Sequence, residues 1–224
     1  MGRIFVLAGT NGAGKSSVGG AYLREQGAAY FNPDEATQAI LRANPDMPLA
    51  EANERAWKDS VRRLREAIAA GTDYAFETTL GGNTVTRLLA EAVDAGLQLV
   101  IWFCGLDSPE RHLARIQTRV ARGGHNIPEY KVRERYDASR NNLIRLMPLA
   151  SALRVYDNSA EADPATGHAP TPVLVLAMDH GVVSYPGPTD LAKTPPWVRP
   201  LVTKAYRLTE SAPPFSPAQQ GDLP

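Results

Sequence analysis

Four residues near the beginning of the sequence have the types and spacing of a phosphate-binding loop. The segment VLAGTNGAGKSS, residues 6–17, fits the pattern G-x-x-x-x-G-K-[ST], with Gly9, Gly14, Lys15 and Ser16 in the fixed positions. Glycines let backbone N–H groups surround phosphates, the lysine reaches the terminal phosphates, and the serine hydroxyl suits Mg²⁺. An apolar strand before the loop and a helix start after it favour a nucleotide triphosphate site over a simple glycine-rich turn. The predicted nucleotide-binding residues are Gly9, Thr10, Asn11, Gly12, Ala13, Gly14, Lys15, Ser16 and Ser17.

Two carboxylates follow predicted strands and are candidates for chemistry beside this loop. Asp34, in FNPDEA, could take a proton from an acceptor hydroxyl, because ligands of open parallel sheets bind beyond the carboxyl ends of the strands. The alternative, which does not exclude the first, is that Asp34 caps the helix that begins there. Glu77, in FETTL, could orient Mg²⁺ through water or bind the acceptor, with Thr78 and Thr79 donating hydrogen bonds beside it. A structural pairing of Glu77 with a helix end or an arginine is the alternative.

Six arginines lie on two predicted helices that meet at the glycine-rich break GGHN. The first helix begins with Ser108 as its N-cap and Pro109 in its first turn, and the second begins near Pro128. Such a pair, over about residues 108–147, could form a lid that brings positive charge to a phosphate in transfer. The alternative is that several of these arginines only solvate helix surfaces. They are Arg115, Arg119, Arg122, Arg133, Arg135 and Arg140.

Apolar segments and helical patterns alternate along the chain and predict the elements that position these residues. The expected strands are RIFVLAG, AAYF, DYAFETTL, LQLVIWFCGL and LRVYDNS. Helices are expected over about 16–26, 48–70 and 84–96, the second from the helical spacing of Trp57, Val61, Leu64 and Ile68. This order predicts an α/β fold: a P-loop NTPase of the nucleoside-kinase type, with a parallel sheet flanked by helices and a helical arginine lid.

The C-terminal part of the chain has a different pattern. The segment VLVLAMDHGVVSY predicts a hairpin with its turn near residues 179–181, and the proline-rich sequence from Pro186 predicts an extended segment to about Tyr206. We therefore expect one domain over residues 1–206, with the hairpin and extended segment over about 172–206. Residues 207–224 are expected to form a disordered tail.

Composition excludes several classes of function. The 224 residues carry 24 basic and 24 acidic side chains, so an extended nucleic-acid or membrane footprint is not expected. No apolar segment approaches the roughly 20 residues of a membrane span. The single cysteine, Cys104, lies in an apolar strand and is interpreted as core filling in a reducing, cytoplasmic setting. Four histidines share no metal-ligand spacing and are expected at the surface or in local hydrogen bonds: His112, His125, His168 and His180.

Five segments together resemble the zeta toxin family, in its branch of zeta-like kinases or predicted ATPases. They are GTNGAGKSS, NPD, FETTL, RVARGGHNIPEYKVRERYDASRNNL and VYDNS, and they cover about residues 3–159. Zeta toxins are P-loop kinases of bacterial toxin-antitoxin systems, and the best known members phosphorylate UDP-N-acetylglucosamine on a sugar hydroxyl. The resemblance thus implies a kinase whose acceptor is a nucleotide sugar or a related metabolite, with an antitoxin protein as a candidate partner.

The resemblance also implies roles for individual positions. Asp34 matches the second acid of the family's D-x-D strand end and would deprotonate the acceptor hydroxyl, whereas Asn32 stands where the first acid would be and removes a charge near the acceptor. The resemblance ends at about Ser159 and implies nothing for the sequence beyond it. The other implied roles are these: Lys15 and Ser16 hold the triphosphate and Mg²⁺, Glu77 lies in the acceptor pocket, Arg119 and either Arg135 (slightly favoured) or Arg133 are the lid arginines, and Asn158 lies near the nucleotide base.

The sequence therefore predicts a Mg²⁺-dependent kinase that transfers the γ-phosphate of ATP or GTP to a hydroxyl of a small metabolite. One alternative is a nucleotide hydrolase or switch, in which Asp34 and Glu77 position water and a protein partner responds to the lid. Another is a nucleotide-binding interaction module with an inactive site.

Overall fold

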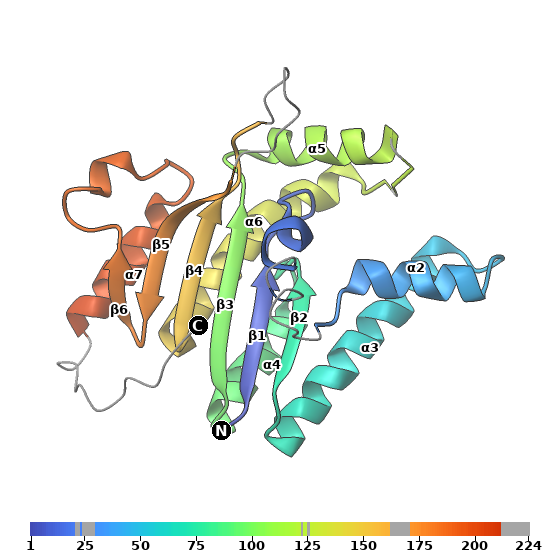
Figure 1. Ribbon diagram of the computed structural model, residues 1–224, viewed down its shortest axis with the longest axis horizontal. Helices are drawn as coiled ribbons and strands as arrows, with labels where there is room; N and C mark the ends of the chain where they lie inside the picture. Colours follow the sequence, from blue (N-terminus) through green and yellow to red (C-terminus); the bar gives the residue numbers. More distant parts are fainter. Residues whose placement is uncertain (21–22, 24–29, 122, 125, 162–170, 212–224) are drawn as a thin grey trace.

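Six strands form a single mixed sheet in the order β2-β1-β3-β4-β5-β6 (Figure 1). The structure, a computed structural model, describes residues 1–20, 23, 30–121, 123–124, 126–161 and 171–211. The first four strands of that order are parallel, and the last two are antiparallel. The strands are β1 (Arg3–Ala8), β2 (Tyr74–Thr78), β3 (Gln98–Gly105), β4 (Ala152–Asp157), β5 (Val173–Asp179) and β6 (Val182–Tyr185).

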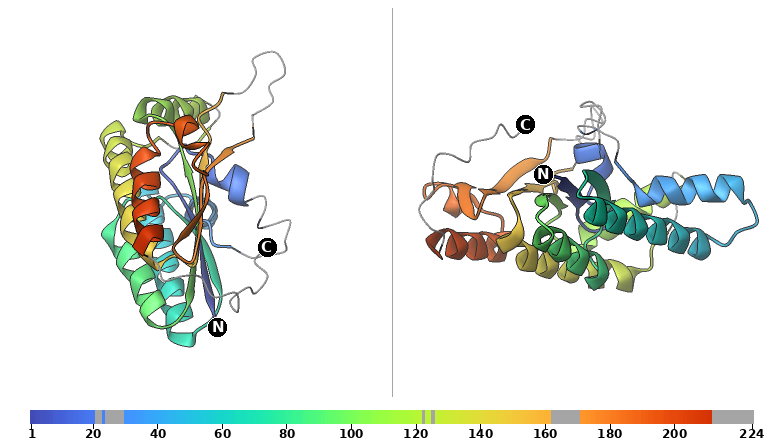
Figure 2. Two further views of the ribbon diagram at one scale, coloured as in Figure 1. Left: turned by 90° about the vertical axis from the view of Figure 1, so that its left-hand side faces the viewer. Right: turned by 90° about the horizontal axis from the view of Figure 1, so that it is seen from below.

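Helices α4, α6 and α7 cover one face of the sheet, and the short π-helical turn η1 lies on the other face (Figure 2). The pair α2 and α3 projects beyond the β2 edge, and α5 crosses the end of the sheet at which the parallel strands finish (Figure 1). The helical elements are η1 (Ser16–Gly20), α2 (Pro33–Ala43), α3 (Leu49–Ala70), α4 (Asn83–Asp94), α5 (Pro109–Ala121), α6 (Glu129–Leu146), η2 (Met147–Leu149), η3 (Leu191–Lys193) and α7 (Arg199–Ser211).

Apolar side chains of β1 and β3, two neighbouring interior strands, form much of the main core. Alternate residues of β1, Ile4, Val6 and Ala8, are fully buried against the covering helices, and Leu99, Ile101 and Phe103 of β3 join the same core. A separate small cluster, formed by Ile116, Ile127 and Val132, packs α5 against α6 and the segment before it. The pair α5 and α6, called the lid below, thus has apolar contacts of its own.

Two expectations near the N-terminus need adjustment. The segment AAYF is not a strand within the described residues, because Phe31 alone pairs there, in an isolated parallel bridge to Phe76 of β2. The helix expected over 16–26 begins as η1, and residues 21–22 and 24–29 lie outside the described residues.

The C-terminal hairpin is confirmed, but the extended segment to Tyr206 is wrong. His180 and Gly181 have φ angles of 47° and 81°, the left-handed backbone that a two-residue hairpin turn requires. Residues 199–211 form α7, which buries Leu201, Val202 and Ala205 in the main core. The prolines concealed this helix: Pro200 is its second residue, where proline needs no N–H partner. The helix also replaces residues 207–211 of the expected tail, and 212–224 lie outside the described residues.

Among the helices of the described ranges, none is long and apolar enough to cross a membrane.

Candidate functional site

The phosphate-binding loop connects β1 to η1 and needs glycine at several positions. Gly9, Gly12 and Gly14 have φ angles of 140°, 83° and 85°, which L side chains rarely adopt. A Cβ on Gly9 would lie 2.1 Å from the carbonyl oxygen of Cys104, and one on Gly14 would lie 2.5 Å from Nδ2 of Asn158. The loop backbone is therefore pressed against β3 and the end of β4, so that larger residues are excluded.

Three buried or half-buried side chains donate hydrogen bonds to backbone carbonyl oxygens of the loop. The carbonyl oxygen of Ala13 accepts hydrogen bonds from Cys104 Sγ, at 3.0 Å, and from Asn158 Nδ2, at 2.8 Å. Nδ1 of His112 donates to the carbonyl oxygen of Asn11 at 2.7 Å. Burial raises the pKa of Cys104 to about 12 and lowers the pKa of His112 to about 4, so the first is a thiol and the second a neutral imidazole.

These contacts bear on three sequence predictions. Cys104 is buried, as expected, and supports the loop. His112 takes a local hydrogen-bonding role, and His180 lies in the hairpin turn, whereas His125 and His168 lie outside the described residues. Asn158, expected near the nucleotide base, packs against the loop backbone at Ala13.

Lys15, Ser16, Asn32 and Glu77 meet at the end of the parallel strands. Strands β1 and β2 pair with Leu7 opposite Glu77, so Glu77 lies beside the beginning of the loop. Its Oε1 is 3.5 Å from Lys15 Nζ, and its Oε2 accepts a hydrogen bond from Ser16 Oγ at 2.8 Å. Asn32 Nδ2 lies 3.4 Å from both Ser16 Oγ and Glu77 Oε2. The buried carboxylate of Glu77 is thus compensated by Lys15 of the loop and by the hydroxyl of Ser16, the first residue of η1.

Asp34 lies in the first turn of α2, but it is not the cap of that helix. The N-cap is Asn32, whose side chain accepts hydrogen bonds from the backbone N–H groups of Asp34 and Glu35. The carboxylate of Asp34 is 49% exposed, and its Oδ2 is 3.9 Å from Nη1 of Arg119 in the last turn of α5. The capping alternative for Asp34 is therefore wrong, and its carboxylate is left to face the lid.

The two candidates for the second lid arginine point in different directions. Arg135 donates from Nη1 to Oδ1 of Asn11 at 2.8 Å, so it reaches the phosphate-binding loop. Arg133 pairs with Glu110 at 2.7 Å and Glu129 at 2.8 Å on the outer surface of the lid, where it is 44% exposed. The structure therefore brings Arg135, and not Arg133, to the loop.

Two other described lid arginines, Arg115 and Arg140, make contacts away from the cleft. Arg115 donates from Nη2 to the carbonyl oxygens of Asn158 and Ala160, at 2.6 and 2.9 Å. Arg140 stacks over the ring of Tyr136 at 3.9 Å, and Arg122 lies outside the described residues. The alternative that several of the six have no part in phosphate binding fits Arg133 and Arg140.

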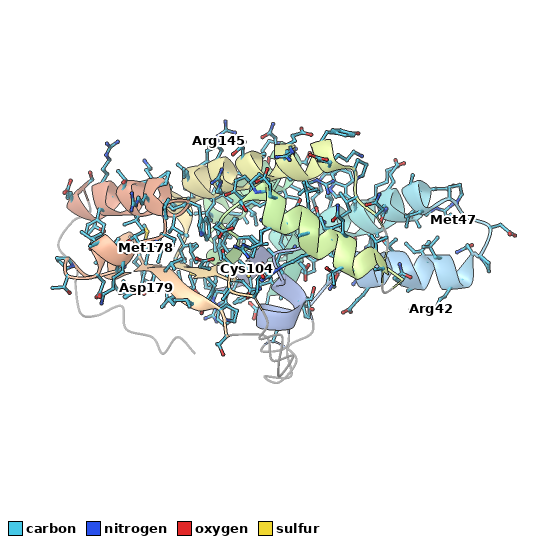
Figure 3. The ribbon with its side chains drawn as sticks, turned by 90° about the horizontal axis from the view of Figure 1, so that it is seen from above. Arg42, Met47, Cys104, Arg145, Met178 and Asp179 are labelled. Atoms are coloured by element: carbon cyan, nitrogen blue, oxygen red, sulfur yellow. The ribbon has the colours of Figure 1, made fainter. Side chains whose placement is uncertain are left out.

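A cleft of about 610 Å³ adjoins the loop, and the residues predicted to bind the acceptor line it. Asp34, Glu77, Thr78, Thr79 and Arg135 are among the residues that line it. The α2–α3 pair forms one wall, and in Figure 3 Arg42 and Met47 mark the outer end of that pair, far from the central position of Cys104. The cleft is lined by the beginning of α2, the first half of α3, the end of β2 and the beginnings of α4 and α6.

The two threonines shape the turn that follows β2. Oγ1 of Thr78 accepts from the N–H of Leu80 at 3.1 Å, and Oγ1 of Thr79 accepts from the N–H of Gly81 at 3.4 Å. Leu80 has a φ of 54°, and Nδ2 of Asn142 donates to its carbonyl oxygen at 2.9 Å. Each hydroxyl still carries its own proton, so both threonines can also donate into the cleft.

Comparisons with known proteins agree with this architecture. The family model described as AAA domain matches residues 4–143. The chain belongs to the AAA domain family. An uncharacterized protein of Haemophilus influenzae is 30% identical to this AAA domain over 134 residues, which are 60% of the chain and 92% of that protein.

Solved structures with little sequence identity share the fold. The structure of AvrRxo1-ORF1:-ORF2 with ATP matches with a TM-score of 0.63 and 16% identity, covering 100% of this chain and 67% of that one. The structure of the same pair with sulphate ions matches with a TM-score of 0.60 and 15% identity, covering 94% and 76%. The predicted α/β P-loop NTPase fold is thus confirmed, whereas membership of the zeta toxin family in particular stays a prediction.

Sequence reasoning did not assign roles to three residues of this AAA domain that the structure brings to the site. Asn32 is the first residue of a helix-start pattern, N-P-D-E, which could have marked it as the N-cap. Trp57 shares the helical spacing of the apolar residues of α3, yet it is 45% exposed and lines the cleft. Ser139 Oγ lies 3.1 Å from Oγ1 of Thr10 in the loop, a contact that no motif indicated.

Proposed function

We propose that this AAA domain is a Mg²⁺-dependent kinase of the zeta toxin type, which transfers the γ-phosphate of ATP or GTP to a hydroxyl of a nucleotide sugar such as UDP-N-acetylglucosamine, or of a related metabolite. The observation that carries the proposal is the cleft of about 610 Å³ beside the phosphate-binding loop. Its volume is within the range of roughly 300–1,000 Å³ typical of small-molecule sites, whereas hydrolysis needs room for water alone. A carboxylate and a lid arginine line it, Asp34 and Arg135.

The residues present fit a nucleotide with Mg²⁺. The left-handed φ angles of Gly12 and Gly14 shape a loop whose backbone N–H groups would bind phosphate, and Lys15, which contacts Glu77 at 3.5 Å, would bind the terminal phosphates. Ser16 and Glu77 place oxygen atoms 2.8 Å apart, and Mg²⁺ prefers such hard ligands, so these two residues would hold it directly or through water. When bound, Mg²⁺ neutralises charge on the β- and γ-phosphate oxygens. A similar structure that contains ATP supports the choice of nucleotide.

The side chains of the cleft support transfer to an organic hydroxyl. Asp34 would accept the hydroxyl proton while the acceptor oxygen forms a bond to the γ-phosphorus and the bond from that phosphorus to the β,γ-bridging oxygen breaks. Arg119 and Arg135 would stabilise the charge on the phosphoryl group in transfer. Thr78 and Thr79 would orient the acceptor by donating hydrogen bonds into the cleft.

A partner protein forms part of the proposal. The AvrRxo1-ORF1:-ORF2 structures are complexes of two proteins, which supports the hypothesis that this kinase is paired with an antitoxin. We further propose that it acts in the cytoplasm, where ATP and sugar nucleotides are available.

Product analysis tests the proposed function directly. The purified protein is incubated with Mg²⁺ and γ-labelled ATP or GTP, with and without a pool of small metabolites that includes UDP-N-acetylglucosamine. A kinase produces a new labelled metabolite that appears only with the pool. Release of free phosphate at the same rate in both samples would instead identify a hydrolase, and the absence of either product would identify a binding module.

A further inference from the structure

Asn32 uses both ends of its side-chain amide, and the two ends belong to different parts of the site. Its Oδ1 accepts hydrogen bonds from the backbone N–H groups of Asp34, at 2.9 Å, and Glu35, at 3.4 Å. Its Nδ2 faces Ser16 Oγ and Glu77 Oε2, each at 3.4 Å. The side chain is 6% exposed, so these contacts are shielded from water. One buried amide therefore connects the helix that carries Asp34 to the oxygen pair of Ser16 and Glu77.

An acidic residue could make the first set of contacts but not the second. Aspartate caps helices as well as asparagine does, because capping needs an accepting oxygen. Near Glu77, however, an ionised carboxylate has no proton to donate, and it would add a second negative charge to a buried carboxylate that is compensated by Lys15 at 3.5 Å. Asn32, which stands where the zeta toxin family has an acid, therefore does more than remove a negative charge: its amide presents a donor to Glu77.

From these contacts we propose that Asn32 is a positioning residue that holds the Glu77 carboxylate toward Ser16 and so couples Mg²⁺ binding to the placement of Asp34. The proposal rests on the proposed function for the roles of Glu77 and Asp34. Residues that orient a metal ligand typically contribute about 10- to 100-fold to metal affinity or activity. A cap alone contributes to stability and would leave the Mg²⁺ dependence unchanged.

Asn32→Ser separates the two roles, because serine keeps an accepting oxygen for the cap but is too short to present an amide to Glu77. Asn44 supplies a matched control at the other end of the same helix, where its Nδ2 donates to the carbonyl oxygen of Ile40 at 3.0 Å. Asn44→Ala thus perturbs α2 without a contact to the loop. A third variant, Glu77→Gln, and its combination with Asn32→Ser show whether Asn32 acts through Glu77.

The experiment measures the affinity of a non-hydrolysable ATP analogue with and without Mg²⁺, together with kcat, KM and melting temperature. We expect Asn32→Ser to reduce the Mg²⁺ enhancement of analogue affinity by about 10-fold or more, and to reduce kcat, with little further loss in the Glu77→Gln background. Asn44→Ala should lower the melting temperature and leave the Mg²⁺ enhancement unchanged.

Two outcomes separate this proposal from the function on which it rests. If Asn32→Ser keeps the full Mg²⁺ enhancement, Asn32 is a helix cap and the coupling is refuted, whether or not the wild-type protein transfers phosphate. If the wild-type protein phosphorylates no acceptor while Asn32→Ser loses the enhancement, the kinase function fails and the orientation of Glu77 by Asn32 stands. If Asn32→Ser does not fold, Asn32→Thr is measured instead, alone and combined with Glu77→Gln. Additive losses of the Mg²⁺ enhancement in these variants refute the coupling in the same way.

Discussion

Arg135 and Arg133 are separated by one residue on α6, and their environments predict opposite results when each is changed to alanine. Arg135 donates to Asn11 Oδ1 at 2.8 Å and lines the cleft. Arg133 pairs with two glutamates at the outer surface of the lid. The pair therefore offers an internal comparison in which charge, helix and substitution are the same.

The expected magnitude follows from what each guanidinium contacts. Loss of one group that stabilises charge in the transition state costs about 10²-fold in kcat, or about 2.7 kcal/mol. Arg135→Ala also loses a charge-assisted hydrogen bond to the loop, which contributes on the order of 1 kcal/mol to stability after discounting for partial exposure, or about 2–4 °C in melting temperature for a chain of this size. Arg133→Ala should change the melting temperature by roughly 2 °C or less and leave kcat close to the wild-type value.

Steady-state kinetics of phosphate transfer, with thermal melts of each variant, provide the assay. We expect Arg135→Ala to lower kcat with little change in the KM for ATP, because contacts made in the transition state affect rate more than ground-state binding. Arg119→Ala should follow Arg135→Ala, and Arg140→Ala should follow Arg133→Ala. Equal losses of kcat in Arg133→Ala and Arg135→Ala would refute the assignment, as would a loss in Arg135→Ala that is explained by unfolding at the assay temperature.

Three further predictions concern the loop, the base and pH. Lys15→Ala should abolish detectable transfer and weaken triphosphate binding, because a charge directed at the β- and γ-phosphates is lost; full turnover in this variant would refute the loop assignment. Asp34→Asn should lower kcat by roughly 10²-fold or more at nearly unchanged nucleotide affinity, and equal losses of rate and affinity would point to a structural role. Burial lowers the pKa of His112 from 6.5 to about 4, so the unfolded chain binds a proton that the folded protein does not, and stability falls as pH decreases from 6.5 toward 4. The loss is on the order of 3 kcal/mol, and thermal melts of His112→Gln across this range should show a flatter pH dependence, whereas an unchanged slope would contradict the role of His112.

The loop and the parallel strands could be predicted because their signals are local. The glycine pattern demands left-handed backbone at Gly12 and Gly14, and continuous apolar runs are typical of strands in the middle of a parallel sheet. The helix α7 could not be found in this way, because prolines before it and Pro200 within its first turn obscured the spacing of Leu201, Val202 and Ala205.

The choice between Arg133 and Arg135 shows a different limit of sequence patterns. The buried face of α6 includes Val132, Ser139 and Asn142, and two of these side chains are polar because they bond to the loop and to the turn after β2. Arg135 lies three residues after Val132 and four before Ser139, so it shares that face. A pattern of apolar residues alone does not reveal the orientation of a helix whose inward face is partly polar.

The contacts of Asn11 restrict how the lid can move. Its carbonyl oxygen is bonded to His112 near the beginning of α5, and its side chain is bonded to Arg135 in α6. A swing of the whole lid as a rigid body would break both bonds, whereas bending of the part between these two anchor points would leave them in place. Arg119 lies on that intervening part. We therefore expect Arg135 to stay in position before substrates arrive, whereas the distance between Arg119 and Asp34, 3.9 Å here, is not fixed by a bond to the loop backbone at Asn11.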